Sequence, residues 1–142
     1  KAYDPTRLVN PASGGNHYLT GDLLDLHNYP APELYLYDHN RPTVLGEYGG
    51  IGLVLEDHLW EPDRNWGYVR FDSPKAVTDE YERYAEILSK LIPNGFSAAV
   101  YTQTTDVEIE VNGLMTYDRK VMKVEPERIR AINTRICHSL DE

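Results

Sequence analysis

Short apolar runs alternate with polar stretches along the chain, and each run predicts a buried strand that leads into a polar or glycine-rich loop. The run at 43–50 shows this most plainly, because it carries a carboxylate, Glu47, shortly before glycines. The pattern recurs at 8–15, 23–29, 43–50 and 96–106. We therefore expect strands whose exits carry the functional residues.

Two later segments show helical periodicity instead. Ser73 predicts an N-cap and Pro74 the first helical residue, after which apolar residues recur every three or four positions until Pro93. A last helix begins at Pro126, and one face of it carries Ile129, Ile132, Ile136 and Leu140. Strands alternating with helices or long loops predict an α/β protein with a parallel sheet, and functional residues at successive strand ends further suggest a (β/α) barrel.

Composition and net charge limit the classes of partner that the chain can bind. The 142 residues are 41% hydrophobic and 26% charged, which predicts one structural unit over residues 1–142. A net charge of -9 disfavours nucleic acid and anionic membrane surfaces as partners, and no apolar run approaches the ~20 residues of a membrane span. The single cysteine, Cys137, cannot form an internal disulfide and does not decide the compartment. The histidines are too scattered for a metal site, so we expect no cofactor.

The aromatic residues are unusual, because eleven tyrosines and two tryptophans stand against two phenylalanines. Rings with a polar handle are suited to carbohydrate sites, although tyrosines also line half-buried strands and helix faces. Trp60 and Trp66 lie in a long irregular stretch, 51–70, where they could stack on a sugar or anchor the loop itself.

Five segments, in order, resemble glycoside hydrolase family 2, the group of β-galactosidases, β-glucuronidases and β-mannosidases. Residues 44–50 are similar to that family's strand seven, where a glutamate before an aromatic residue and glycine is the nucleophile; the others are 4–9, 25–29, 101–103 and 112–119. The resemblance implies the C-terminal half, about strands five to eight, of a (β/α)8 TIM barrel. It implies a retaining glycoside hydrolase acting on a β-galactoside or related β-glycoside.

The resemblance assigns roles to individual residues. Glu47 becomes the nucleophile that forms a covalent glycosyl-enzyme, one of two carboxylates that retaining hydrolysis needs ~5–5.5 Å apart. Tyr29 and His27 would donate hydrogen bonds that keep this carboxylate ionised. The remaining substrate-binding residues that the resemblance implies are Tyr101, Gln103 and Asn112.

Two readings stay open. Asn112-Gly113 between alternating apolar residues is a strong hairpin signal by itself, and Glu47 considered alone could be a solvated glutamate at a strand end. The family's acid/base is a glutamate that follows an asparagine, and no Asn-Glu dipeptide occurs in these 142 residues. We therefore expect it upstream, on an N-terminal half of the same barrel as partner, and an isolated chain that is inactive. The alternative is a non-catalytic carbohydrate-binding or interaction half barrel.

Overall fold

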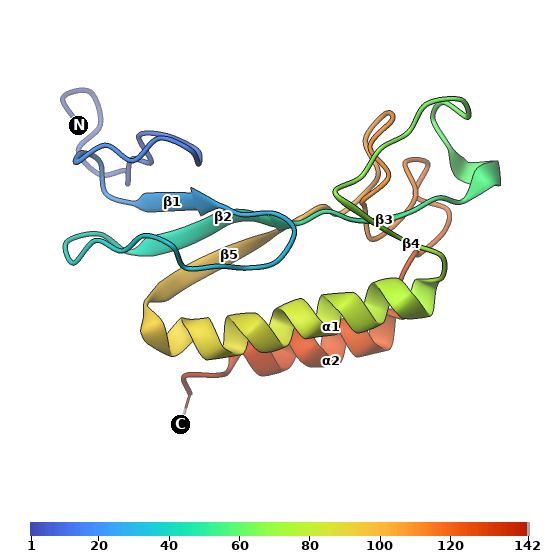
Figure 1. The fold of residues 1–142 in the computed structure, drawn as a ribbon. Coiled ribbons are helices and arrows are strands. Elements are labelled where there is room, and N and C mark those ends of the chain that lie inside the picture. The colour runs from blue at the N-terminus through green and yellow to red at the C-terminus, as the bar shows by residue number, and fades with distance from the viewer. Residues whose placement is uncertain (142) are drawn as a thin grey trace.

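The computed structural model describes residues 1–141, and it consists of two small parallel sheets with two helices on one side of them (Figure 1). The elements are β1 (Leu24–His27), β2 (Thr43–Gly49), β3 (Ile51–Leu53), η1 (Glu56–His58), β4 (Val69–Phe71), α1 (Pro74–Leu91), η2 (Ile92–Asn94), β5 (Phe96–Thr102) and α2 (Pro126–Cys137). The strands predicted at 23–29, 43–50 and 96–101 are therefore confirmed as β1, β2 and β5.

The first sheet has the strand order β1-β2-β5, and both pairings are parallel. Leu26 lies opposite Leu45, and Leu45 lies opposite Ala99 on the other side. Because the three strands run in the same direction, their C-terminal ends meet at one edge of the sheet, which is where α/β proteins place their ligands. Glu47 on β2 lies near this edge.

The second sheet pairs β3 with β4, also in parallel. Only Gly50 separates β3 from β2, so the chain leaves the first sheet and enters the second almost without interruption. The long connection predicted between 51 and 70 becomes β3, the η1 turn and the loop that returns to β4. This loop lies beyond the exit of β2, to the right in Figure 1.

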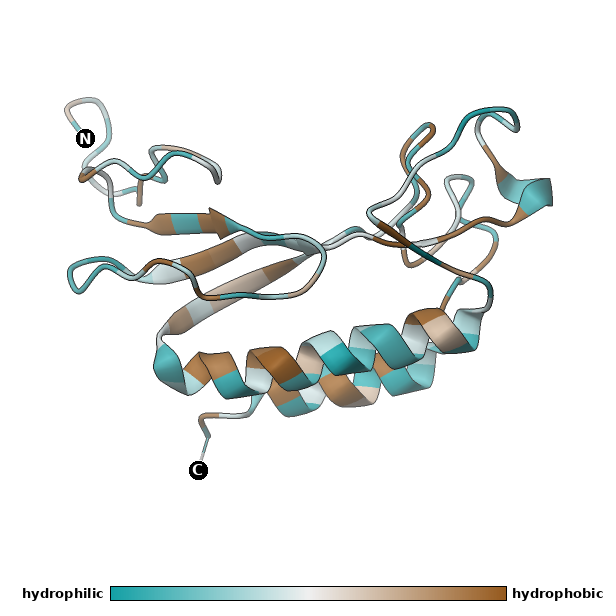
Figure 2. Ribbon diagram, in the orientation of Figure 1, coloured by the Kyte–Doolittle hydropathy of each residue, from teal (hydrophilic) through white to brown (hydrophobic). Residues whose placement is uncertain are grey.

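Both predicted helices are present. The Ser73 hydroxyl accepts a hydrogen bond from the Ala76 amide at 3.3 Å and Pro74 is the first helical residue, so α1 begins where the sequence predicts. Ile129 and Ile132 of α2 are buried, whereas Leu140 lies beyond the helix and is 70% exposed. The core lies between the first sheet and α1, and Figure 2 shows hydrophobic residues along β1, β2 and β5 and in patches on the helices.

The predicted half barrel is wrong. The described residues form sheets of three and two strands with two helices, which is a small mixed α/β arrangement and not strands five to eight of a (β/α)8 barrel. The expected first strand, residues 8–10, is absent, and β1 is joined to β2 by a loop where a barrel would have a helix. Only α1 serves as a crossover helix between parallel strands of the first sheet.

The reasons for both differences lie in local chemistry. Leu8 is 73% exposed, and Val9 uses its backbone N–H on the Asp22 carboxylate at 2.7 Å instead of on a neighbouring strand. The connection from β1 to β2 carries Pro30 and Pro32, which remove backbone donors and prevent a regular helix there. Apolar spacing alone did not show that these segments lack a surface to pack against.

Candidate functional site

Glu47 and Tyr29 meet at the C-terminal edge of the first sheet. The Tyr29 hydroxyl donates to Oε2 of Glu47 at 2.7 Å and also lies 2.8 Å from the Thr102 hydroxyl, at the end of β5. Residues at the ends of β1, β2 and β5 therefore meet at the Tyr29 hydroxyl. The Glu47 side chain is 44% exposed, so one face of the carboxylate is open to a bound molecule while the other is held by Tyr29.

Tyr29 is held as a proton donor. Burial is the main cause that raises the pKa of its hydroxyl well above the ordinary value, the Glu47 carboxylate raises it further, and the contact with Thr102 opposes the shift. The Tyr29 hydroxyl donates its one proton to Glu47, because an ionised carboxylate can only accept hydrogen bonds. Tyr29 therefore keeps its proton, and its hydrogen bond to Glu47, throughout the neutral and mildly alkaline range.

His27 and Asp25 support Glu47 from β1. His27 Nδ1 lies 3.4 Å from Oε2 of Glu47, and its Nε2 lies 3.6 Å from Oδ1 of Asp25. Asp25 is buried, and it accepts hydrogen bonds from the Asn10 side chain at 2.6 Å and the Gly46 amide at 3.1 Å. A Cβ at Gly46 would lie 2.1 Å from the Asp25 carboxylate, so glycine is required directly before Glu47. Asp25 was not predicted from the sequence to be a site residue. It alternates with His27 and Tyr29, however, and this two-residue spacing places the three side chains on one face of a strand.

An aromatic platform adjoins Glu47. The Tyr68 ring stacks on the Tyr29 ring with centroids 3.8 Å apart and planes 2° apart, and Trp66 meets Tyr68 edge-on at 5.2 Å. Gly50 has a φ of +68°, and a Cβ there would lie 2.3 Å from the Tyr68 ring, so this glycine permits the stack. Tyr68 and Trp66 are 45% and 40% exposed, which leaves ring surface open to a bound molecule. Trp66 was expected from the sequence as a possible stacking residue, whereas Tyr68 was not.

Trp60, the other tryptophan considered for stacking, belongs to a different part of the surface. It packs edge-on against Tyr117, with ring centroids 5.6 Å apart, and it is 60% exposed. No contact joins it to Glu47 among the residues that the structure describes. It therefore does not form part of the platform.

Gln103 and Asn112 form a polar network next to the end of β5. Gln103 Nε2 donates to Oδ1 of Asn112 at 2.7 Å, and Asn112 Nδ2 donates to Oε1 of Glu110 at 2.8 Å. Asn112 is fully buried, and its neighbour Gly113 donates to Asp106 at 2.7 Å. The hairpin that Asn112-Gly113 suggested is absent, because this loop makes isolated bridges and places the asparagine inside the network. Asn112 thus orients its neighbours and is not itself exposed to a sugar.

Tyr101 is placed away from Glu47. Its ring packs against Tyr48 and Tyr81 at 5.6 and 4.8 Å, in the layer between β5 and α1, and burial raises the pKa of its hydroxyl strongly. A cavity of about 640 Å³ lies on this side, between β5 and the two helices. Its lining is mostly apolar and includes no carboxylate, so we assign the chemistry to the Glu47 cluster and not to this cavity.

Neither models of protein families nor curated proteins show a match to this chain. Among residues 1–141, no group of three or more His, Cys, Asp or Glu side chains is arranged to hold a metal ion. No helix in the same residues is both long and apolar enough to cross a membrane. The part of the structure that bears on function is the cluster of Glu47, Tyr29 and Tyr68.

Proposed function

We propose that this chain supplies the nucleophile of a retaining glycoside hydrolase acting on β-galactosides or related β-glycosides. The observation that carries the proposal is the Glu47 carboxylate, half exposed, held at 2.7 Å by the half-buried Tyr29 hydroxyl and flanked by an aromatic platform. A sugar that stacks on Tyr68 or Trp66 would lie beside the open face of this carboxylate. The resemblance to glycoside hydrolase family 2 names the same glutamate.

The reaction divides into two displacements. In the first, a Glu47 oxygen forms a bond to the anomeric carbon while the bond to the leaving oxygen breaks, and that oxygen takes a proton from a carboxylic acid. In the second, water gives a proton to the carboxylate that the first step left ionised and attacks the anomeric carbon, while the ester bond breaks and Glu47 returns to its ionised form. Tyr29 orients the attacking carboxylate and keeps its own proton during both steps.

The proton donor comes from outside this chain in our proposal. The family's acid/base follows an asparagine, and these 142 residues contain no Asn-Glu dipeptide. General acid catalysis contributes ~10²–10⁴-fold, so a chain that lacks it turns over ordinary glycosides slowly or not at all. A partner segment that carries the second carboxylate would complete the site.

Covalent trapping tests Glu47 without requiring a proton donor. The probe is a 2-deoxy-2-fluoro galactoside whose dinitrophenolate leaving group departs without needing a proton. We expect intact mass spectrometry to show one glycosyl group per chain, and peptide mapping to place it on Glu47. Glu47→Gln should take up no label. Glu33→Gln makes the same change at an exposed glutamate of the β1 to β2 loop and should label normally. Label on another residue would refute the nucleophile assignment.

A second candidate function uses the same residues without chemistry. The stacked Tyr29 and Tyr68 rings and the exposed Trp66 would bind a carbohydrate even if no proton donor ever joins the chain. The chain would then be a carbohydrate-binding module. Binding of methyl β-galactoside, seen by NMR at the amides of residues 46–50 and 66–68, with no label on Glu47, would favour this candidate.

A further inference from the structure

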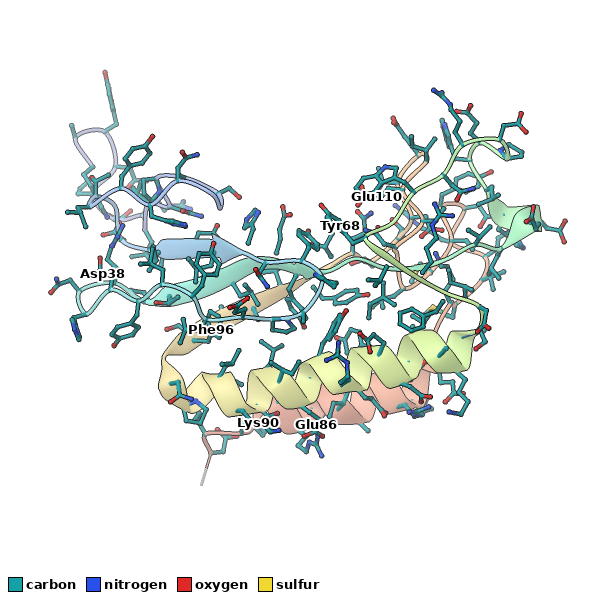
Figure 3. All side chains as sticks on the ribbon, in the orientation of Figure 1. Asp38, Tyr68, Glu86, Lys90, Phe96 and Glu110 are labelled. Carbon is teal, nitrogen blue, oxygen red and sulfur yellow. The ribbon has the colours of Figure 1, made fainter. Side chains whose placement is uncertain are left out.

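Glu110 lies in the polar network beside the aromatic platform, and neither the sequence reading nor the proposed mechanism gives it a role. Backbone pairing brings it there: the Trp66 amide donates to the Ile109 carbonyl at 2.9 Å and the Val111 amide donates to the Trp66 carbonyl at 2.8 Å. These two bonds form a parallel bridge that places Glu110 opposite Trp66. In Figure 3 the labelled Tyr68 and Glu110 accordingly lie close to each other beyond the exit of β2.

Two carboxylates flank the platform. Glu110 is bridged in parallel to Trp66, whose ring meets the Tyr68 ring at 5.2 Å, so Glu110 lies beside the platform on the side away from Glu47 in the chain of contacts. Consistent with this, burial and then the negative charges of Glu110 and Glu47 raise the pKa of the Tyr68 hydroxyl above its ordinary value. Tyr68 is the ring that stacks on Tyr29, and Tyr29 in turn holds Glu47. The platform therefore runs from the Glu47 carboxylate to the Glu110 carboxylate.

The Glu110 carboxylate is oriented but not neutralised. Asn112, itself fully buried, donates to one of its oxygens at 2.8 Å and is fixed in turn by Gln103. Within residues 1–141, no hydrogen bond to the other oxygen is formed, and no lysine, arginine or histidine nitrogen lies within 4 Å of it. An oriented, unpaired carboxylate at a sugar platform accepts hydrogen bonds from hydroxyl groups and repels other anions.

We propose that Glu110 selects neutral sugars at the Glu47 site, by accepting hydrogen bonds from their hydroxyl groups and repelling sugars that carry a carboxylate. This inference rests on the proposed function, because it concerns the sugar that Glu47 attacks. Glu110 and Glu47 are both acidic, and the chain carries a net charge of -9. A uronic acid on the platform would thus place a third carboxylate beside those of Glu47 and Glu110.

The test compares two sugars that differ only in this charge. Methyl β-galactoside and its 6-carboxylate, methyl β-galactosiduronate, are titrated into the intact chain, and dissociation constants are read from NMR shifts of the amides of residues 46–50. We expect the uronate to bind about tenfold more weakly or worse, consistent with one like-charge contact at a partly solvated site. Equal binding, or preference for the uronate, would overturn the proposal.

Variants assign the preference to Glu110. Glu110→Gln keeps an oxygen for Asn112 but removes the charge, so the preference for the neutral sugar should fall about tenfold. Glu108→Gln removes the same charge from an exposed side chain two residues away and should keep the wild-type preference. An unchanged preference in Glu110→Gln would refute the role of Glu110 while leaving the Glu47 proposal intact.

A measurement on the unaltered chain tests the proposal even if Glu110→Gln does not fold. Salt screens exposed charges, with a Debye length of ~10 Å at 0.1 M and ~3 Å at 1 M, so uronate binding should strengthen with added NaCl while galactoside binding stays constant. Parallel salt effects on both sugars would contradict the proposal. Absence of shifts with either sugar overturns the inference, and fluoro-glycoside labelling of Glu47 shows separately whether the proposed function also fails.

Discussion

At the scale of residues, the site depends on one phenol that joins three strand ends. Tyr29 contacts Glu47 and Thr102 through its hydroxyl and Tyr68 through its ring. Its hydroxyl holds the carboxylate and its ring holds the platform, so a single residue couples the two halves of the site. Substitution by phenylalanine separates these roles, because it removes the hydroxyl and keeps the ring.

We expect Tyr29→Phe to leave the alkaline titration of the folded protein unchanged. Burial and the Glu47 carboxylate raise the pKa of Tyr29 above the ordinary value of 10.0, so the folded state holds this proton at pH values where an unfolded chain releases it. The tyrosinate absorbance that develops between pH 9 and 11 should be equal in the two proteins. Tyr3 is fully exposed, and Tyr3→Phe should lower that absorbance by one tyrosine. A similar loss in Tyr29→Phe would mean that its pKa is ordinary.

The same shift sets the sign of a stability effect. A group whose pKa is higher in the folded state loses stabilisation as pH rises above its unfolded value. The folded chain should therefore lose stability above pH 10, because Tyr29 ionises in the unfolded chain while it stays protonated in the folded one, and Tyr29→Phe should lose less. Denaturant unfolding at pH 8 and pH 10.5 measures both proteins on one scale.

The sequence could predict the residues that meet at Glu47 but not those that hold them. Glu47, Tyr29 and His27 stand at strand exits, a position that apolar runs mark directly. Asp25 and Tyr68 were missed because their roles depend on close approach to Gly46 and Gly50, which only coordinates reveal. A glycine beside a strand exit signals such an approach without naming the partner.

At the scale of elements, a buried ion pair holds the loop that carries Asn112. Lys123 is fully buried, and its ammonium group donates to Asp106 at 2.6 Å and to the Val111 carbonyl at 2.8 Å. Burial is the main cause that lowers the pKa of Lys123 and raises the pKa of Asp106. Each member of the pair is tolerated only because the other is present.

Lys123→Met should destabilise the protein by about 3–5 kcal/mol, because it leaves Asp106 buried without its partner. Adding Asp106→Leu should recover much of this loss, since no uncompensated charge then stays buried. Urea unfolding measures the three proteins. Lys120→Met alters a side chain that is 73% exposed and should change stability by less than about 0.5 kcal/mol. A loss of that small size in Lys123→Met would show that the pair does not hold the loop.

Elements with their own partners were the ones that the sequence predicted well. The N-terminus of α1 is fixed by Ser73 and Pro74, and β2 is a strand with neighbours on both sides. Residues 8–10 have a strand-like composition but pair with the Asp22 loop, because Leu8 is left 73% exposed by residues 1–141. Composition predicts what a segment can form, and the available partner decides what it does form.

At the scale of the whole molecule, the first sheet ends in an unprotected strand. Within residues 1–141, β5 pairs only with β2, and its residues Ser97 to Val100 are exposed. The segment 96–105 carries no charged residue, although charges are the usual protection of an open strand edge. The apolar cavity between β5 and the helices lies along the same edge. An edge of this kind favours pairing with another strand.

We expect the purified chain to form dimers in which β5 pairs with β5 of a second copy, since two-fold symmetry makes such a pairing antiparallel and self-complementary. The net charge of -9 opposes the contact at long range, so the dimer fraction in sedimentation velocity should rise with both protein concentration and salt. Val100→Lys places a charge on the edge, where the side chain is 54% exposed, and should shift the equilibrium to monomer. Leu19→Lys adds the same charge at a residue that is 96% exposed and far from β5 in sequence, and should leave the dimer unchanged. A chain that sediments as a monomer at every concentration, or equal behaviour of the two variants, would show that the β5 edge does not associate.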